Sequence, residues 1–122
     1  MLILLPPSEG KTRPTTGDPL DLNSLSSPRL NPTREQLLNA LIRLSGTKKA
    51  AEILGLGAQQ ATDVEHNTNL RTAPTAAAID VYTGVLFGEL DWPSLSSAAQ
   101  ARGNDRLAIA SALFGLLRPT DP

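Results

Sequence analysis

The clearest pattern in the chain is a run of apolar residues that recur every three or four positions between residues 37 and 44. Such spacing is typical of an amphipathic helix that packs one side against a core. The residues of this apolar stripe are Leu37, Leu38, Leu41, Ile42 and Leu44. Thr33 has the character of an N-cap, because Gln36 three positions later completes a capping box. The pattern therefore predicts a helix over residues 33–45, with its stripe in the core.

Two short apolar runs have the length of strands rather than helices. Residues 2–5 form an uninterrupted run that Pro6 and Pro7 close, which predicts a fully buried strand. Residues 107–111 form the second run, and we expect the two strands to be neighbours in one sheet. Loops that follow strands on a rigid scaffold often carry functional residues. The segments after residues 5 and 111 are therefore the first places to look for a site.

Weaker helical patterns cover most of the remaining chain. They predict helices over 48–54, 58–67, 72–90 and 94–101, with a turn at 102–105. Residues 13–32 are rich in proline and serine and predict a long surface loop. The sequence as a whole predicts a single helix-rich α+β domain over residues 1–122, with a few short strands.

The composition excludes several kinds of functional site. The 122 residues carry 11 basic and 12 acidic side chains, so any nucleic-acid binding has to come from a local patch. The absence of cysteine excludes disulfides, thiol catalysis and zinc–thiolate sites. With one histidine, we expect no metal site and no cofactor. The apolar start lacks a basic leader and is too short to span a bilayer, so we expect a cytoplasmic protein without membrane association.

The end of the sequence leads to a further expectation. A proline-punctuated turn, residues 118–122, directly follows the apolar residues 113–117. Because a domain is expected to cover its last apolar run, we expect this chain to be the N-terminal half of a larger mixed α/β fold. Exposed faces of Leu113, Leu116 and Leu117 would then favour self-association.

The loop after the first predicted strand, residues 8–12, concentrates hydroxyls and charges. Its Gly-Lys-Thr end is similar to a phosphate-binding P-loop, but Leu5 stands where that motif needs its first glycine. The proline-rich residues that follow cannot open the helix that a P-loop requires. What remains is a cleft in which Lys11, with Ser8 and Thr12, faces an anion. The alternative is a solvated lysine in a turn.

Arg118 comes after the second predicted strand and could complete this cleft. If the two strands are neighbours, the loops after them bring Lys11 and Arg118 to one edge of the sheet. Two cations at that edge would suit a phosphate, which arginine binds bidentately.

Residues 47–67 form a second candidate site, which we call the glycine hairpin. Gly55-Leu56-Gly57 separates two predicted helices, a pattern typical of a helix-hairpin-helix. The glycines allow a tight turn. The amides of Gly57, Ala58 and Gln59 would then face a DNA phosphate at the start of the second helix. Such contacts to the backbone of DNA give affinity without sequence preference.

The charges of the glycine hairpin leave its role open. Lys48 and Lys49 lie upstream of the turn and would strengthen phosphate binding. The second predicted helix contains Asp63 and Glu65 but no lysine or arginine. The same turn also serves plain packing of two helices, so DNA binding and packing remain as alternatives.

Three blocks of sequence together resemble the YaaA family of bacterial peroxide stress proteins. They are residues 1–12 (MLILLPPSEGKT), residues 80–84 (DVYTG) and residues 114–121 (FGLLRPTD), in the order of the family. The resemblance covers the whole chain, and family members are about twice as long. Carried over by position, Lys11 belongs to the first block, Tyr82 and Gly84 to the second, and Gly115 and Arg118 to the third. Phe114 stands where a tyrosine is common.

The resemblance implies a cytoplasmic protein that limits free iron under hydrogen peroxide stress and thereby protects DNA. It also implies a mixed α and β fold with a positively charged cleft, a helix-hairpin-helix and DNA binding. Our leading hypothesis is therefore a DNA-binding protein of the oxidative-stress response. The alternative is an enzyme that acts on a nucleotide or nucleic acid, with Lys11, Tyr82 and Arg118 around the substrate. A third interpretation is that Tyr82 and Arg118 only hold loops together.

Overall fold

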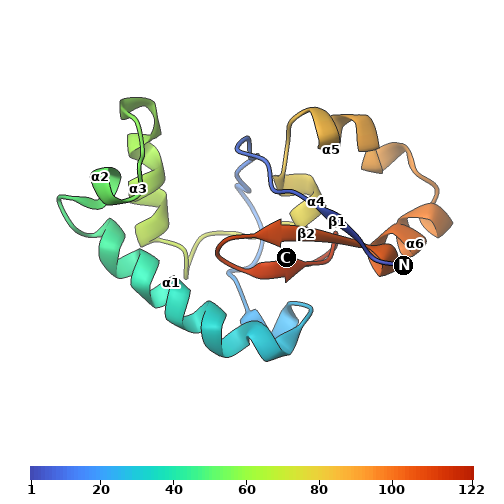
Figure 1. Cartoon of the computed structure of the whole chain (residues 1–122), viewed down its shortest axis with the longest axis horizontal. Helices are drawn as coiled ribbons and strands as arrows, with labels where there is room; N and C mark the ends of the chain where they lie inside the picture. Colours follow the sequence, from blue (N-terminus) through green and yellow to red (C-terminus); the bar gives the residue numbers. More distant parts are fainter.

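The computed structural model describes all residues from Met1 to Pro122 and shows a small sheet between two groups of helices (Figure 1). The first group comprises α1 (Asn31–Ser45), α2 (Ala50–Ile53) and α3 (Ala61–Thr68). The second comprises α4 (Ala78–Val81), α5 (Val85–Leu90) and α6 (Ser97–Arg106). The sheet consists of β1 (Ile3–Leu5), β2 (Leu107–Ser111) and β3 (Gly115–Leu117). The predicted helix-rich α+β class is thus confirmed.

The three strands are ordered β1-β2-β3 across the sheet. β1 runs parallel to β2, with Ile3 opposite Leu107, as expected for neighbouring strands. The chain then reverses, and β3 pairs antiparallel with β2, with Leu117 opposite Ile109. The sequence did not predict β3, because three residues, of which the first is Gly115, carry no usable periodicity.

The prediction that the first strand is fully buried is wrong. Leu2, Ile3 and Leu4 retain exposed fractions of 53%, 42% and 57%. β1 is the edge strand of the sheet, so nothing flanks it on one side. Because side chains alternate along a strand, Leu2 and Leu4 also lie on the face opposite Leu5, which packs against the core.

The core lies on the other face of the sheet. Ile109 of β2 is completely buried at its centre. Ile79 of α4, Phe87 of α5 and Trp92 of the 3-10 helix η4 (Trp92–Ser94) belong to the same apolar cluster, together with Leu117 of β3. The two aromatic residues supply area that the many small aliphatic side chains cannot.

Helix α1 confirms the strongest pattern in the sequence, with changes at its start. It begins at Asn31 rather than at Thr33, directly after the 3-10 helix η2 (Pro28–Leu30). Pro32 occupies its first turn, where the missing N–H costs nothing. Thr33 is therefore inside the helix and does not cap it. Of the predicted apolar stripe, only Leu38 is fully buried, whereas Leu37 is exposed.

The shorter helices differ more from the prediction. The expected helix 48–54 is reduced to α2, and the helix after it begins with the 3-10 turn η3 (Ala58–Gln60) before α3. The expected helix 72–90 is two helices, α4 and α5, separated by extended residues 82–84. Helix α6 starts later than residue 94 and continues through the turn that we expected at 102–105. No helix in the chain combines the length and the apolar character needed to cross a membrane.

Candidate functional site

The loop that follows β1 is held by pairing with the segment between α4 and α5. Lys11 and Tyr82 form an isolated antiparallel bridge. The Thr12 amide donates to the Val81 carbonyl at 2.7 Å, and the Thr83 amide donates to the Gly10 carbonyl at 3.1 Å. This pairing explains why the predicted helix 72–90 is interrupted, because the backbone at Tyr82 is extended to bond the loop.

Ser8 has a structural role in this loop. Its hydroxyl donates to the Gly10 carbonyl at 2.6 Å and accepts from the Thr83 amide at 3.2 Å. Both functions of the hydroxyl are therefore used inside the chain. Gly10 is confined by the side chain of Thr83, since a Cβ there would lie 2.6 Å from Thr83 Oγ1.

Lys11 is the charged residue of the loop. Its side chain is exposed and crosses the Tyr82 ring, with Nζ 5.4 Å from the ring centroid. Nζ donates to the Ser8 carbonyl at 2.8 Å and more weakly to the Glu9 carbonyl at 3.4 Å. An ammonium has three donors, so one remains for a ligand. The cation–π contact and the carbonyls together fix where that donor stands.

A cleft of about 450 Å³ separates this loop from the glycine hairpin. Arg13 of the loop and Asp63 of α3 form an ion pair across it. The structure thus brings together the two regions that the sequence singled out separately. The cleft is lined by Glu9, Lys11, Thr12, Arg13, Pro14, Leu54, Leu56, Asp63, Asn67 and Val81.

Arg118 does not lie with Lys11, contrary to the expectation of a shared sheet edge. Its guanidinium donates to the carbonyls of Leu107 at 3.0 Å and Asp105 at 3.1 Å, at the start of β2. Lys11 lies beyond the end of β1, which is the opposite end of the parallel pair. The cause is β3, because its antiparallel course carries the chain back along β2 before it reaches Arg118. In this structure Arg118 binds backbone carbonyls.

The glycine hairpin contains the tight turn that the sequence predicts. Gly55 has φ +67°, a left-handed conformation that favours glycine. The Gly57 amide is not free, because it donates to the side chain of Gln60 at 3.1 Å. The amides of Ala58 and Gln59 have no acceptor in the chain, as is usual for the first residues of a helix. Lys48 and Lys49 are exposed in the turn before α2.

Sequence reasoning missed a buried polar cluster around Arg34 and Asp121. Arg34 has an exposed fraction of 1%, and burial lowers the pKa of its guanidinium while the charge of Asp121 opposes that shift. The Asp121 carboxylate accepts from the Ser26 hydroxyl at 2.8 Å and from the Arg118 amide at 2.9 Å. The sequence contained one indication that Arg34 is buried. Arg34 lies four residues before Leu38 and therefore on the same side of α1. No group of three or more acidic or histidine side chains is placed to hold a metal ion.

Comparison with known proteins identifies the class to which this fold and these blocks belong. The model of the family described as peroxide stress protein YaaA matches residues 1–122. The chain is 45% identical over 123 residues to a UPF0246 protein of Streptomyces coelicolor, covering 99% of this chain and 47% of that protein. It is 43% identical over 122 residues to a UPF0246 protein of Corynebacterium glutamicum, covering 100% and 48%. A protein of Campylobacter jejuni without a described function is 32% identical over 124 residues, covering 99% and 50%.

The chain therefore belongs to the peroxide stress protein YaaA family, as the resemblance in the sequence indicated. Membership suggests a role in peroxide stress. The chain spans about half the length of the curated relatives that it matches.

Proposed function

We propose that this chain acts in the peroxide stress response by binding the phosphate backbone of DNA through the glycine hairpin. The observation that carries the proposal is the start of the helix after Gly57, where the amides of Ala58 and Gln59 have no acceptor in the chain. Helix N-termini with free amides bind phosphates well. The left-handed Gly55 makes the turn that precedes them.

Charge around the hairpin supports weak, sequence-independent binding. Lys48 and Lys49 are exposed one short helix upstream. Asp63, which would otherwise repel a phosphate, is paired with Arg13. Because few phosphates are contacted, affinity should fall with salt along a shallow log–log slope. Neutralising about two phosphates gives a slope of roughly −2, at about 0.9 per phosphate.

The test is a comparison of two double variants that lose the same charge. Lys48→Ala/Lys49→Ala removes the hairpin cations, and Arg29→Ala/Arg106→Ala removes two exposed cations elsewhere. Fluorescence anisotropy with a labelled duplex is measured over a range of salt concentrations. The hairpin variant should bind more weakly and flatten the slope by about one to two units, and the control should behave as the parent. Equal behaviour of the two variants would refute the hairpin as the DNA contact.

On the family resemblance alone, we propose that the protein also limits free iron under peroxide stress. Cells that lack the parent gene should show more chelatable iron after peroxide treatment, measured by electron paramagnetic resonance of the iron–chelator complex. Complementation with the parent should restore the lower level. Complementation with a hairpin variant that has lost DNA binding then tells whether the two effects depend on each other.

A further inference from the structure

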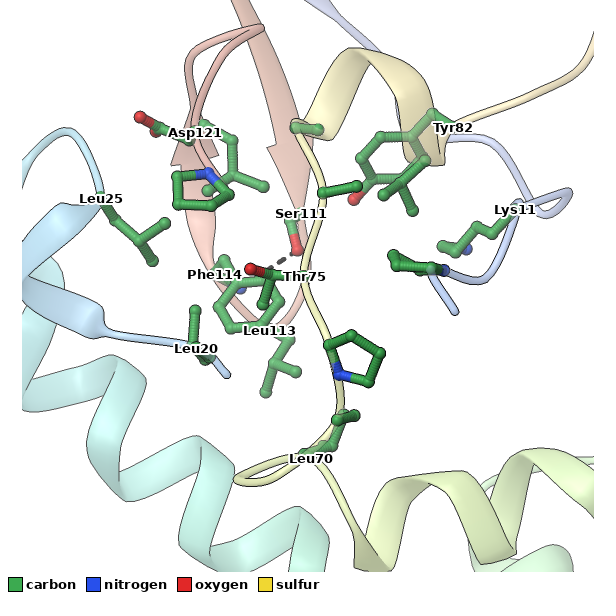
Figure 2. A pocket seen from close by; sticks show the side chains of 18 of the residues that line it. Lys11, Leu20, Leu25, Leu70, Thr75, Tyr82, Ser111, Leu113, Phe114 and Asp121 are labelled. Atoms are coloured by element: carbon green, nitrogen blue, oxygen red, sulfur yellow. Dashed lines mark hydrogen bonds between the residues drawn. The ribbon is translucent and has the colours of Figure 1, made fainter. Parts of the chain in front are cut away.

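A second cavity of about 350 Å³ lies beside the Lys11 loop, under the connection from α3 to α4 (Figure 2). It adjoins the cleft at the glycine hairpin, with which it shares the lining residues Lys11, Pro14, Asn67 and Val81. Its volume falls within the range that small-molecule sites occupy in proteins. Most of its wall is apolar, and the main apolar side chains are Leu20, Leu25, Leu70, Leu113, Phe114 and Leu117.

Tyr82 is the polar residue that points into this cavity. Its side chain has an exposed fraction of 8%, and its ring stacks on Phe87 with centroids 5.6 Å apart. Figure 2 shows the Tyr82 hydroxyl directed toward the middle of the cavity, on the side of Ser111. This hydroxyl is hydrogen-bonded to no residue of the chain and is accessible from the cavity. The unpartnered phenol therefore indicates a place for a ligand atom.

A second polar atom is available in the same space. The Ser111 hydroxyl oxygen accepts from the Phe114 amide at 3.1 Å, which leaves its own proton free to donate. Figure 2 shows the hydrogen bond between Ser111 and Phe114 at the cavity. A ligand inside the cavity would thus meet the hydroxyls of Tyr82 and Ser111 between mainly apolar walls.

The two ends of the cavity carry side chains of opposite charge. Lys11 lies at one end and Asp121 at the other (Figure 2). The Asp121 carboxylate is already occupied by Ser26 and Arg118, whereas Lys11 Nζ keeps one donor and stands over the Tyr82 ring. A negative group of a ligand is therefore attracted to the Lys11 end.

We propose that this cavity binds a small aromatic carboxylate, with its ring against Leu113 and Phe114 and its carboxylate at Lys11. The Tyr82 hydroxyl would donate to the same carboxylate or to a polar atom of the ring. The aromatic rings of Tyr82 and Phe114 in the wall favour an aromatic ligand. The position of the single lining cation, Lys11, favours an anionic one. This inference is independent of DNA binding at the glycine hairpin.

The experiment uses three probes that share one ring and differ in charge: indole-3-acetate, indole and tryptamine. Isothermal titration calorimetry gives their affinities for the intact chain, and amide shifts in NMR spectra locate them. Indole-3-acetate should bind about two- to five-fold more tightly than indole, as expected for a partly exposed ion pair, and tryptamine should bind most weakly. Amide shifts should be concentrated at Tyr82, Ser111 and Phe114.

Two variants test the assigned groups. Lys11→Met keeps an apolar stem over the Tyr82 ring but removes the charge, so it should abolish the preference for indole-3-acetate and leave indole binding unchanged. Arg102→Met, which removes an exposed cation of α6, is the control and should keep the preference. Tyr82→Phe should weaken indole-3-acetate binding two-fold or more. The proposal is overturned if no probe binds, if the three bind equally, or if the preference survives in Lys11→Met.

Discussion

The Nε atom of Arg34 donates a hydrogen bond to the carbonyl oxygen of Phe114 at 2.8 Å, which joins the first turn of α1 to the turn between β2 and β3. The same guanidinium donates to the carbonyls of Leu116 at 3.0 Å and Ser26 at 2.9 Å. One buried arginine thus donates to carbonyls of two segments, the loop before α1 and residues 114–116 at the far end of the chain. Helix α1 is held to the sheet by this cation as well as by apolar packing.

Replacing Arg34 with methionine should therefore destabilise the fold strongly. Methionine fills a similar space but removes the donor of three partly buried carbonyl groups, and it removes the charge that faces Asp121. We expect a loss of about 3 kcal/mol in the free energy of unfolding. Urea denaturation measures it. Arg29→Met in the neighbouring helix η2, where the side chain is exposed, should stay within about 0.5 kcal/mol. Equal losses in the two variants would contradict the role given to Arg34.

How far the sequence alone could predict this fold depended on the length of each pattern. The residues of β2 and most of α1 were predicted because each pattern is regular over its whole element. The strand β3 has only three residues and was missed, and its antiparallel course is what removes Arg118 from Lys11. No local signal could have shown this, because it depends on which strand the segment pairs with.

The candidate site was likewise predicted only in part from the sequence. Lys11 and Tyr82 were both named from the sequence, yet the bridge between them and the cavity beside them are tertiary features. Residues 72–90 have the composition of one helix, but pairing of Tyr82 with the N-terminal loop overrides that propensity. Burial of β1 was wrongly inferred from its apolar residues, since composition does not tell an edge strand from a central one.

Glu35 and Arg71 give a pH-dependent contribution to stability. The hydrogen bond from Arg71 is the largest effect on the Glu35 carboxyl and holds its pKa below the ordinary value of 4.5. Desolvation opposes it, and the charge of Arg71 and a hydrogen bond with Asn39 add to the lowering. The contribution is therefore present above about pH 4.5 and is lost as the pH falls through the lowered pKa. We expect the parent to be more stable than Glu35→Gln near neutral pH, and the difference to vanish in acid. Thermal unfolding of both proteins across this range measures the difference. A difference in stability between the two proteins that increased in acid would contradict the prediction.

The two glycines of the hairpin should respond differently to alanine. Gly55 has φ +67° with open space around its Cα, so Gly55→Ala meets only backbone strain, which costs about 1 kcal/mol. Gly57 has φ −76°, and the nearest atom to an added Cβ is Gln60 Oε1 at 3.9 Å. Gly57→Ala should be neutral or stabilising by up to about 1 kcal/mol, because it restricts the unfolded chain. Unfolding curves of both variants give the comparison, and the reverse order would show that the turn is not built as described.

Gly103 and Trp92 provide the last prediction. An added Cβ at Gly103 of α6 would lie 2.7 Å from Cζ3 and 2.9 Å from Cη2 of the Trp92 ring, so the ring has to move. Trp92 is a buried member of the core cluster, and displacing it costs about 1–3 kcal/mol. The intrinsic fluorescence reports on this residue alone, because it is the single tryptophan of the chain. Gly103→Ala should therefore shift the emission to longer wavelength as the ring gains water, and should lower the midpoint of urea unfolding.

The matched control for Gly103 is Gly88, which lies in α5 with nothing within 4 Å of an added Cβ. Gly88→Ala should leave the emission of Trp92 unchanged. It should also stabilise the chain by about 0.5–1 kcal/mol, because alanine loses less backbone entropy in a helix than glycine does. The sequence predicts Gly103 as part of a turn, but it lies inside α6, where it leaves room for the Trp92 ring. A glycine with this role does not mark the end of a helix. An unshifted emission in Gly103→Ala would contradict this role of Gly103.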